Sequence, residues 1–314
     1  MADSVKIFAP ATSANLTCGF DVLGLCLEAP GDEVIMRKTS KQGVKIKSIQ
    51  GDGGKLSLDP AKNTVGVSAI EFLNAYQEVH EVDFGIEIEL HKKMPFGSGM
   101  GSSAASAVAG AFGANELLGK PFDKRELLPF AMEGERQSCG TAHADNVAPS
   151  LFGGIVLVRS YHPLDVIPLN VPVGLHVVIV YPHVEVKTSD ARKVVPQQIP
   201  LSQAIEQWGN LAGLIAGFMK PDYDLLSRSM KDVIVEPHRS QFIPQYKELK
   251  DIALSQRALG FGISGSGPSV FALTNNYHVA RKIGDDMVAE LSSKNYECSL
   301  YHSKINEVGP QVLD

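Results

Sequence analysis

The alternation of apolar and polar positions is clearest over residues 84–90, where every second position is apolar. This period of two predicts a strand with one buried face. Glycine and serine dominate residues 97–103, and a run of small residues continues to residue 109. The stretch therefore predicts a strand, a glycine loop and a closely packed helix.

The rest of the chain mixes short apolar runs with helical periods, which predicts an α+β fold. Apolar runs predict strands over residues 5–8 (ending at Pro10), twice within 31–58, and over 155–158, 175–180, 261–263, 270–273 and 297–301. Apolar residues at helical spacing predict helices over residues 64–80 (capped by Asn63), 121–135, 202–219, 222–235 and 244–258.

Two further expectations follow from the pattern. Trp208 and Met219 lie at helical spacing in the predicted helix 202–219, so we expect both in the core. The apolar character changes after Val158, which places a domain boundary near residues 160–172. We therefore predict an N-terminal domain over residues 1–165 and a C-terminal domain over residues 166–314.

Composition narrows the function classes. Hydrophobic residues make up 44% and charged residues 20%, as in ordinary globular proteins. The net charge of −6 predicts no general attraction to nucleic acid or anionic membranes. The four cysteines are scattered and fit reduced thiols, the N-terminus lacks the apolar region of a secretory signal, and the apolar runs are too short to cross a membrane. These features predict a cytoplasmic protein.

The glycine loop has the composition of an anion site. Gly97, Gly99 and Gly101 permit positive φ and close approach of a ligand, and Ser102 and Ser103 stand where a helix begins with unpaired N–H groups. A Walker A loop has lysine after its last glycine, and a dinucleotide loop has the spacing G-x-G-x-x-G, so the loop matches neither. A plain tight turn uses the same residues, and composition alone leaves both interpretations open.

Three motifs carry a resemblance to a known family. Residues 95–104 (PFGSGMGSSA) resemble the phosphate loop of the GHMP kinases, the small-molecule kinases of galactose, homoserine, mevalonate and phosphomevalonate. Residues 9–16 (APATSANL) and 263–269 (ISGSGPS) resemble two other motifs of this family, in the same order. The narrower resemblance, over nearly the whole chain, is to the branch that phosphorylates L-homoserine.

The resemblance implies a two-domain α+β architecture of mixed sheets with packed helices, and an active-site cleft between the domains. It also implies transfer of the γ-phosphate of ATP to the side-chain hydroxyl of L-homoserine, a step toward threonine. The expected nucleotide-binding residues are Pro95, Gly97, Ser98, Gly99, Met100, Gly101, Ser102, Ser103 and Ala104.

The loop contains no lysine to neutralise the phosphates, so phosphoryl transfer needs a metal ion held against them. Glu135, in a segment dense in polar groups, is expected to hold Mg²⁺ together with the hydroxyl of Ser103 and to take part in catalysis. ATP and Mg²⁺ are therefore the expected cofactors.

The resemblance places His143, Asp145 and Asn146 opposite the acceptor hydroxyl, the last two as catalytic residues. In mevalonate and galactose kinases the matching acid pairs with a basic residue of the first motif and is proposed to act as the base. Residues 10–14 contain no lysine or arginine, which favours the homoserine branch and leaves the role of Asp145 open. Alignment of the acceptor hydroxyl with the γ-phosphate, and stabilisation of the charge in the transition state, can then supply much of the catalysis.

The remaining substrate candidates each have a simpler alternative. An amide and a carboxylate at Asn15 and Asp21 can bind an ammonium group, or form an Asx turn and a cap. Guanidinium groups at Arg192 and Arg239 can bind a carboxylate, or form surface ion pairs. Gly265 lies in a second glycine loop that closes the site by resemblance and otherwise fits a tight turn.

Two other functions are compatible with the sequence. A different GHMP kinase, of the mevalonate, shikimate or sugar type, would not need the two arginines. A nucleotide-binding regulator without turnover is the second alternative. The sequence leaves the oligomeric state open, including a homodimer.

Overall fold

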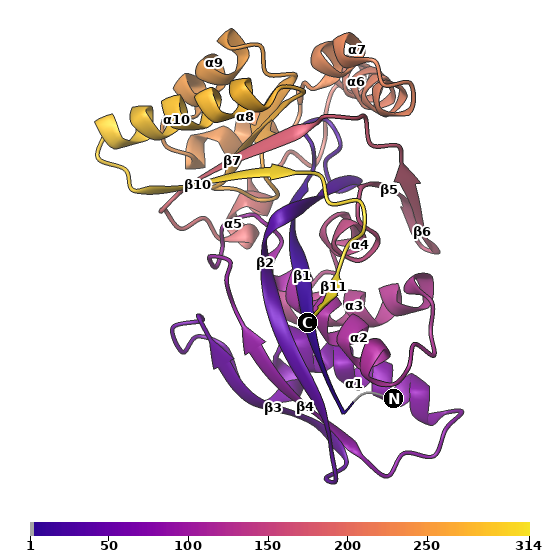
Figure 1. The fold of residues 1–314 in the computed structure, drawn as a ribbon. Helices are drawn as coiled ribbons and strands as arrows, with labels where there is room; N and C mark the ends of the chain where they lie inside the picture. The colour runs from indigo at the N-terminus through magenta and orange to yellow at the C-terminus, as the bar shows by residue number, and fades with distance from the viewer. Residues whose placement is uncertain (1–2) are drawn as a thin grey trace.

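The computed structural model describes residues 3–314, apart from the side chains of Ser138 and Cys139. The described strands form two sheets, each with helices packed against it (Figure 1). Cys18, Cys26 and Cys298 carry free thiols, while the side chain of Cys139 lies outside the description. Within residues 3–314 no helix combines the length and the apolar character of a membrane-crossing segment.

The first sheet contains seven strands within the described residues and is mixed. Strands β11, β1, β2, β4 and β3 lie side by side, and β5 and β6 extend from β2. β3 and β4 pair in parallel, and the other neighbours pair antiparallel. The strands are β1 (Ser4–Ala14), β2 (Leu23–Thr39), β3 (Gly43–Gln50), β4 (Gly85–His91), β5 (Ile155–Tyr161), β6 (Leu164–Leu169) and β11 (Gln311–Leu313).

The predicted end of the first strand at Pro10 is wrong, because β1 continues to Ala14. The pairing of β1 with β2 shifts register between Pro10 and Thr12, and such an irregularity accommodates a residue without an N–H group. The continuation matters for function, since it carries Thr12 and Ser13 up to the glycine loop.

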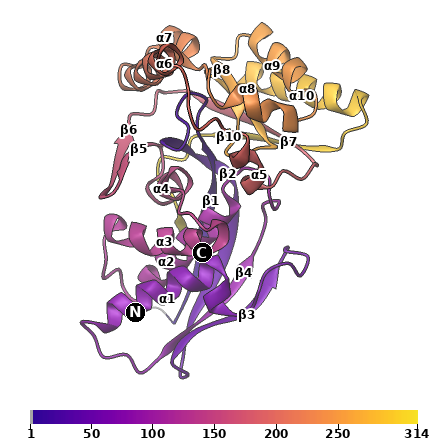
Figure 2. The same ribbon diagram turned by 180° about the vertical axis from the view of Figure 1, so that it is seen from behind.

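Helices of the first half of the chain cover one face of the first sheet (Figure 2). They are α1 (Thr64–Gln77), α2 (Ser102–Leu117), α3 (Lys124–Cys139) and α4 (Ala144–Phe152), with a short 3₁₀ helix η1 (Pro60–Lys62) before α1. α2 contacts β1 and β2 as well as the other three helices. Its small residues permit this crowding: a Cβ on Gly110 would lie 2.2 Å from Ser68 Oγ in α1.

The second sheet is antiparallel, in the order β10-β7-β9-β8. Its strands are β7 (His176–Pro182), β8 (Gly260–Ile263), β9 (Val270–Thr274) and β10 (Cys298–Lys304). The helices of this half are α5 (Thr188–Lys193), α6 (Leu201–Met219), α7 (Tyr223–Ser229), α8 (Glu236–Arg239), α9 (Tyr246–Ser255) and α10 (Tyr277–Ser293), with η2 (Ser240–Phe242) after α8. α9 and α10 pack on the sheet around a core that includes Phe261 and Met287.

The predicted helix over residues 222–235 is wrong, because α7 ends at Ser229. The Asp232 carboxylate accepts hydrogen bonds from the backbone N–H groups of Ile234, Val235 and Glu236, at 2.9, 3.0 and 2.9 Å. A short acidic side chain that binds the backbone ahead of it competes with helix continuation. The resulting turn leads into α8, which carries Arg239.

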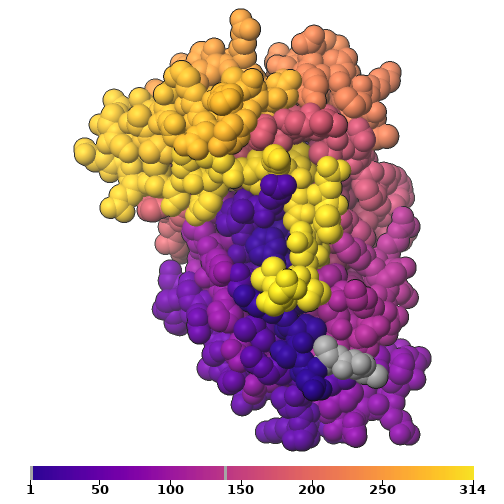
Figure 3. Space-filling view, viewed as in Figure 1, coloured from indigo at the N-terminus to yellow at the C-terminus, as the bar shows by residue number. Residues whose placement is uncertain are grey.

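The change of sheet comes a few residues later than the predicted domain boundary between residues 165 and 166. That boundary falls within β6, which pairs with β5 in the first sheet. The chain also returns to the first sheet at its end, where β11 pairs with β1. Figure 3 shows this C-terminal segment on the surface beside the N-terminal strands. The division at residue 165 stays a prediction.

The expectation that Trp208 and Met219 lie in the core is wrong, because they are 60% and 54% exposed. The opposite side of α6, including Leu214 and Phe218, is buried instead. α6 is apolar on both sides, and a helical period does not tell which side faces the core.

We predict that the fluorescence of Trp208, the single tryptophan, reports this exposure. The emission maximum of the native protein should lie close to that of the protein in denaturant, because solvent already reaches the ring. Trp208→Ser should change the free energy of unfolding by less than about 1 kcal/mol. A native emission far to the blue, or a larger loss of stability, would place the indole in the core.

Candidate active site

Backbone contacts bring the three sequence motifs together. The Thr12 N–H group donates to the carbonyl of Met100 at 3.1 Å, which joins the end of β1 to the glycine loop. The Ser269 N–H group donates to the carbonyl of Ser98 at 3.2 Å, which joins the turn between β8 and β9 to the same loop. The Ser264 hydroxyl lies 2.8 Å from the carbonyl of Gly99 and 2.9 Å from the Ser13 hydroxyl. Segments from both halves of the chain thus meet at one point.

The spacing of the glycines follows from these contacts. A Cβ on Gly99 would lie 2.3 Å from the carbonyl oxygen of Ser264, and one on Gly101 would lie 2.0 Å from Thr12 Oγ1. Both residues also have positive φ, +79° and +64°. Gly97 has φ +64° but open space where a Cβ would stand. Two glycines therefore serve close approach, and the third serves the turn alone.

The glycine loop joins β4 to α2, as predicted, and Gly101 is the N-cap of α2 in the left-handed conformation. Ser102 and Ser103 form the first turn, where backbone N–H groups have no partner within the helix. Of the predicted nucleotide contacts, Gly97, Ser98, Gly99, Gly101, Ser102 and Ser103 line the cavity. Met100 and Ala104 are buried, and the Pro95 carbonyl accepts a hydrogen bond from the Ser98 hydroxyl at 2.9 Å.

A lysine missed by the sequence analysis lies beside the loop. Lys92 pairs with the buried carboxylate of Asp32 and donates to the Ser102 carbonyl and the Ser106 hydroxyl, both at 2.9 Å. Burial lowers the pKa of Lys92, and the Asp32 carboxylate opposes that shift. Asp32 also accepts from the N–H group of Lys93 at 2.8 Å. The pair fixes the loop to its helix, and its sequence signal is a lysine directly after the strand.

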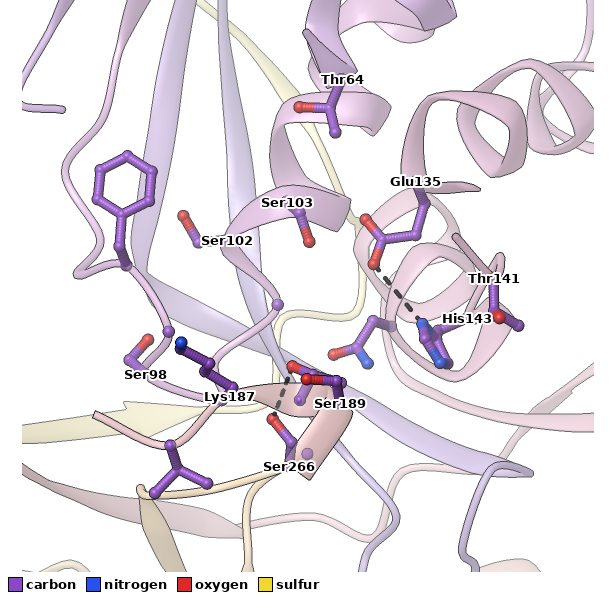
Figure 4. A pocket seen from close by; sticks show the side chains of 18 of the residues that line it. Thr64, Ser98, Ser102, Ser103, Glu135, Thr141, His143, Lys187, Ser189 and Ser266 are labelled. Atoms are coloured by element: carbon purple, nitrogen blue, oxygen red, sulfur yellow. Dashed lines mark hydrogen bonds and ion pairs between the residues drawn. The ribbon is translucent and has the colours of Figure 1, made fainter. Parts of the chain in front are cut away.

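A cavity of about 660 Å³ opens between the two halves of the chain beside this loop. The first half contributes the loop, Glu135 and His143, and the second contributes residues of α5, Arg239 and the turn at Gly265. Figure 4 shows the Ser103 hydroxyl and the Glu135 carboxylate turned toward the same part of the cavity. Every residue predicted to bind substrate, metal or the acceptor hydroxyl lines this cavity: Asn15, Asp21, Ser103, Glu135, His143, Asp145, Asn146, Arg192, Arg239 and Gly265.

Asn15 and Asp21 are joined to each other and to the second half of the chain. The side-chain amide of Asn15 donates to the Gly265 carbonyl at 2.6 Å, and its oxygen accepts from the Asp21 N–H group at 3.1 Å. The Asp21 carboxylate pairs with an arginine, which differs from the helix cap that the sequence left open. It accepts two hydrogen bonds from the guanidinium of Arg192, at 2.5 and 3.0 Å.

Arg192 extends this pairing to His143. Its Nη2 lies 3.2 Å from His143 Nε2. Burial and the charge of Arg192 lower the pKa of His143, so the imidazole is neutral and Nε2 accepts from the guanidinium. The proton then resides on Nδ1, which lies 3.9 Å from the Glu135 carboxylate. A polar chain thus runs from Asp21 to Glu135 along one wall of the cavity.

Arg239 is buried, with 3% exposure, and forms no ion pair within the described residues. Its Nε donates to the Ala191 carbonyl at 2.9 Å and its Nη1 to the Gly265 carbonyl at 3.2 Å. Burial, and next the charge of Arg192, lower its pKa to about 10, so it stays positively charged at neutral pH. A buried cation without a carboxylate partner at the wall of a cavity is suited to an anionic ligand.

Asn146 and Asp145 differ in what they can do. The Thr12 hydroxyl donates to Asn146 Oδ1 at 2.8 Å, which leaves the amide N–H groups to donate to a ligand. Asp145 is 3% exposed, and its Oδ1 has no hydrogen-bond partner among the described residues. Burial, and next the Asp21 carboxylate, raise the pKa of Asp145 to about 7. Thr12, from the first motif, is a second residue that sequence reasoning missed.

Comparisons with known proteins agree with this arrangement. The sequence matches the N-terminal domain of GHMP kinases over residues 64–154 and the C-terminal domain over residues 214–293. A homoserine kinase of Chlorobium phaeobacteroides is 48% identical over 99% of both chains. A homoserine kinase of Methanococcus vannielii is 36% identical over 96% of both. The chain belongs to the homoserine kinases of the GHMP kinase family.

Solved structures support the same family. The crystal structure of homoserine kinase from Cytophaga hutchinsonii superposes with a TM-score of 0.96 at 54% identity, over 100% of this chain and 98% of that one. The structure of L. major mevalonate kinase with R-mevalonate gives a TM-score of 0.70 at 15% identity, over 96% of both chains, and supports the fold alone. The predicted α+β GHMP kinase architecture is thereby confirmed.

We predict that Gly99→Ala and Gly97→Ala differ sharply in stability. Gly97→Ala should cost only the strain of positive φ, about 1 kcal/mol. Gly99→Ala should cost about 2–4 kcal/mol, because the new Cβ meets the Ser264 carbonyl and separates the two loops. Chemical denaturation of both variants is the measurement, and equal losses would contradict the packing described for Gly99.

Asp145 should make stability depend on pH. Its folded pKa of about 7 lies above the ordinary 3.8, so the folded state binds more protons between these values. The free energy of unfolding should therefore fall as pH rises from about 4 to 7, by at most about 4 kcal/mol. Asp145→Asn should remove this fall, whereas the control Asp224→Asn, at an exposed position, should keep it. A wild-type profile that stays unchanged in Asp145→Asn would exclude the raised pKa.

Proposed function

We propose that this protein transfers the γ-phosphate of ATP to the side-chain hydroxyl of L-homoserine, forming O-phospho-L-homoserine on the route to threonine. The observation that carries the proposal is a single cavity with a phosphate-type loop on one side and Asp21, Arg192 and Arg239 on another. A phosphate donor and a zwitterionic amino acid fit these two regions. Relatives that are similar over nearly their full length are homoserine kinases.

The nucleotide is held by the loop of residues 95–104. The N–H groups at the start of α2 and the hydroxyls of Ser102 and Ser103 donate to phosphate oxygens. Lys92 also lines the cavity, but the Asp32 carboxylate already balances its charge. The donors at the start of α2 and a bound Mg²⁺ would therefore take the place of the lysine found in other phosphate loops.

Ser103 and Glu135 fit a magnesium site. A hydroxyl and a buried carboxylate turned toward the same part of the cavity are oxygen donors of the kind that Mg²⁺ prefers. The described part of the chain has no group of three His, Cys, Asp or Glu side chains that could hold a metal alone. Ser103 and Glu135 would therefore hold the ion together with phosphate oxygens of the nucleotide. Bound Mg²⁺ would neutralise charge on the phosphates.

The amino acid is oriented by opposite charges at one wall. Its ammonium group is bound by the Asp21 carboxylate and the amide of Asn15, and its carboxylate by Arg192 and Arg239. Asp21 and Arg192 already form an ion pair. The ammonium group of the ligand would lie beside Asp21 and its carboxylate beside Arg192, so that each charge has neighbours of the opposite sign. Gly265 supports this wall, because its carbonyl binds both Asn15 and Arg239.

In the transfer, the acceptor oxygen forms a bond to the γ-phosphorus as the bond to ADP breaks, and the hydroxyl loses its proton. Asn146 can donate hydrogen bonds to the reacting oxygens but cannot take a proton, because an amide is not basic. Asp145, with its pKa of about 7, is the candidate proton acceptor. Orientation of the two substrates by the cavity supplies much of the rate.

The test is ADP release by the purified protein with Mg·ATP and one of five acceptors: L-homoserine, mevalonate, galactose, shikimate or L-serine. We expect turnover with L-homoserine alone, with the product identified by phosphorus NMR. Turnover with another acceptor would overturn the proposed substrate. ATP binding without turnover of any acceptor would favour a regulator. A homodimer stays a prediction, which sedimentation of the same sample addresses.

A further inference from the structure

The ring of Phe20 lies against both candidate carboxylate-binding arginines. The guanidinium carbon of Arg192 is 5.0 Å from the ring centroid, and that of Arg239 is 4.8 Å from it. Phe20 precedes Asp21, the ion-pair partner of Arg192. The ring of Phe20 therefore contacts both cations, one from α5 and one from α8, in cation–π geometry.

The two arginines need such support, because like charges so close together repel each other. The charge of Arg192 contributes to the lowered pKa of Arg239. Asp21 balances Arg192, whereas Arg239 has only backbone carbonyls as hydrogen-bond acceptors within the described residues. The negative faces of an aromatic ring attract both cations and add flat surfaces that fix the planes of the guanidinium groups.

The backbone around Phe20 is held in an unusual conformation. Asn15, Leu16, Thr17 and Asp21 all have positive φ, at 75°, 41°, 67° and 60°, without being glycine. This conformation is strained for residues other than glycine, and it persists only where neighbouring contacts hold the backbone in place. Here the bond from Asn15 to Gly265 and the bond from the Tyr161 hydroxyl to the Asp21 carbonyl, at 3.0 Å, hold the two ends of the loop.

Phe20 also borders a small cavity of about 10 Å³, which is about the size of one water molecule. Asp232, Val235 and Arg239 line the same cavity. Little free volume is therefore left where Phe20 and these three residues meet.

We infer that Phe20 is a positioning residue that holds Arg192 and Arg239 as one carboxylate-binding pair. It thereby sets the selectivity of the acceptor site for an amino acid over an amino alcohol without a carboxylate. The inference rests on the proposed function, because it assigns the two arginines to the substrate carboxylate.

The test compares Phe20→Leu with wild type, using steady-state kinetics with Mg·ATP and L-homoserine. Phe20→Leu should raise the KM of homoserine about five- to twentyfold, and leave the KM of ATP and kcat within about threefold. 3-Aminopropan-1-ol has the ammonium and hydroxyl groups of homoserine without the carboxylate. Its inhibition constant as a competitor of homoserine should change less than about twofold between Phe20→Leu and wild type. This contrast separates lost carboxylate binding from general damage to the site.

Two further variants complete the design. Phe20→Tyr keeps an aromatic face and should restore the homoserine KM to within about threefold of wild type. Phe242→Leu makes the same change in η2, outside the cavity, and should behave like wild type. Native circular dichroism of each variant confirms that it folds.

The outcomes distinguish the two levels of inference. A wild type that phosphorylates homoserine, together with an unchanged homoserine KM in Phe20→Leu, overturns the role of Phe20 alone. An equal rise in the KM of homoserine and in the inhibition constant of 3-aminopropan-1-ol also overturns it. Such a result indicates that Phe20 has a structural role and does not affect carboxylate binding in particular. A wild type that neither binds nor phosphorylates homoserine overturns the proposed function and this inference together.

Discussion

The contact on which the site depends is the meeting of three backbone segments around the Ser264 hydroxyl. That hydroxyl bridges the end of β1 and the glycine loop, while Gly99 lets the two loops touch without a side chain between them. β1 and the glycine loop belong to the first half of the chain and Ser264 to the second, so the contact joins the two halves beside the cavity.

Charge around the cavity is arranged by burial as much as by pairing. Asp32 balances Lys92 under the phosphate region, and Asp21 balances Arg192 at the acceptor wall. Arg239 and Asp145 are buried and form no ion pair with the residues that the structure describes. Burial therefore lowers the pKa of Arg239 to about 10 and raises that of Asp145 to about 7. The carboxylate of an amino acid would supply the negative charge that Arg239 lacks, which is a physical basis for preferring an amino acid to an uncharged alcohol.

The sequence predicts the parts of this structure that depend on local chemistry. Glycine, serine and alternation give the strand, loop and helix around Gly97 to Ser103, and the motif resemblance places Asn15, Glu135 and Arg239 at one cavity. Features that depend on residues far away in the sequence could not be predicted from local sequence patterns. Segments far away in the chain decide the exposure of Trp208 and the passage of β1 through Pro10. They also decide which residues contact Lys92, Thr12 and Phe20. The roles of the individual site residues in binding and catalysis are still predictions.

The return of the chain to its first sheet has a consequence for synthesis. β11 covers one side of β1 at Lys6, Ile7 and Phe8, and it is formed by residues 311–313. The ribosome synthesises β1 long before β11, so this edge of the first sheet stays unpaired while the intervening residues are made. During that time the nascent protein exposes an open strand edge, a state in which edge pairing between neighbouring chains competes with correct closure.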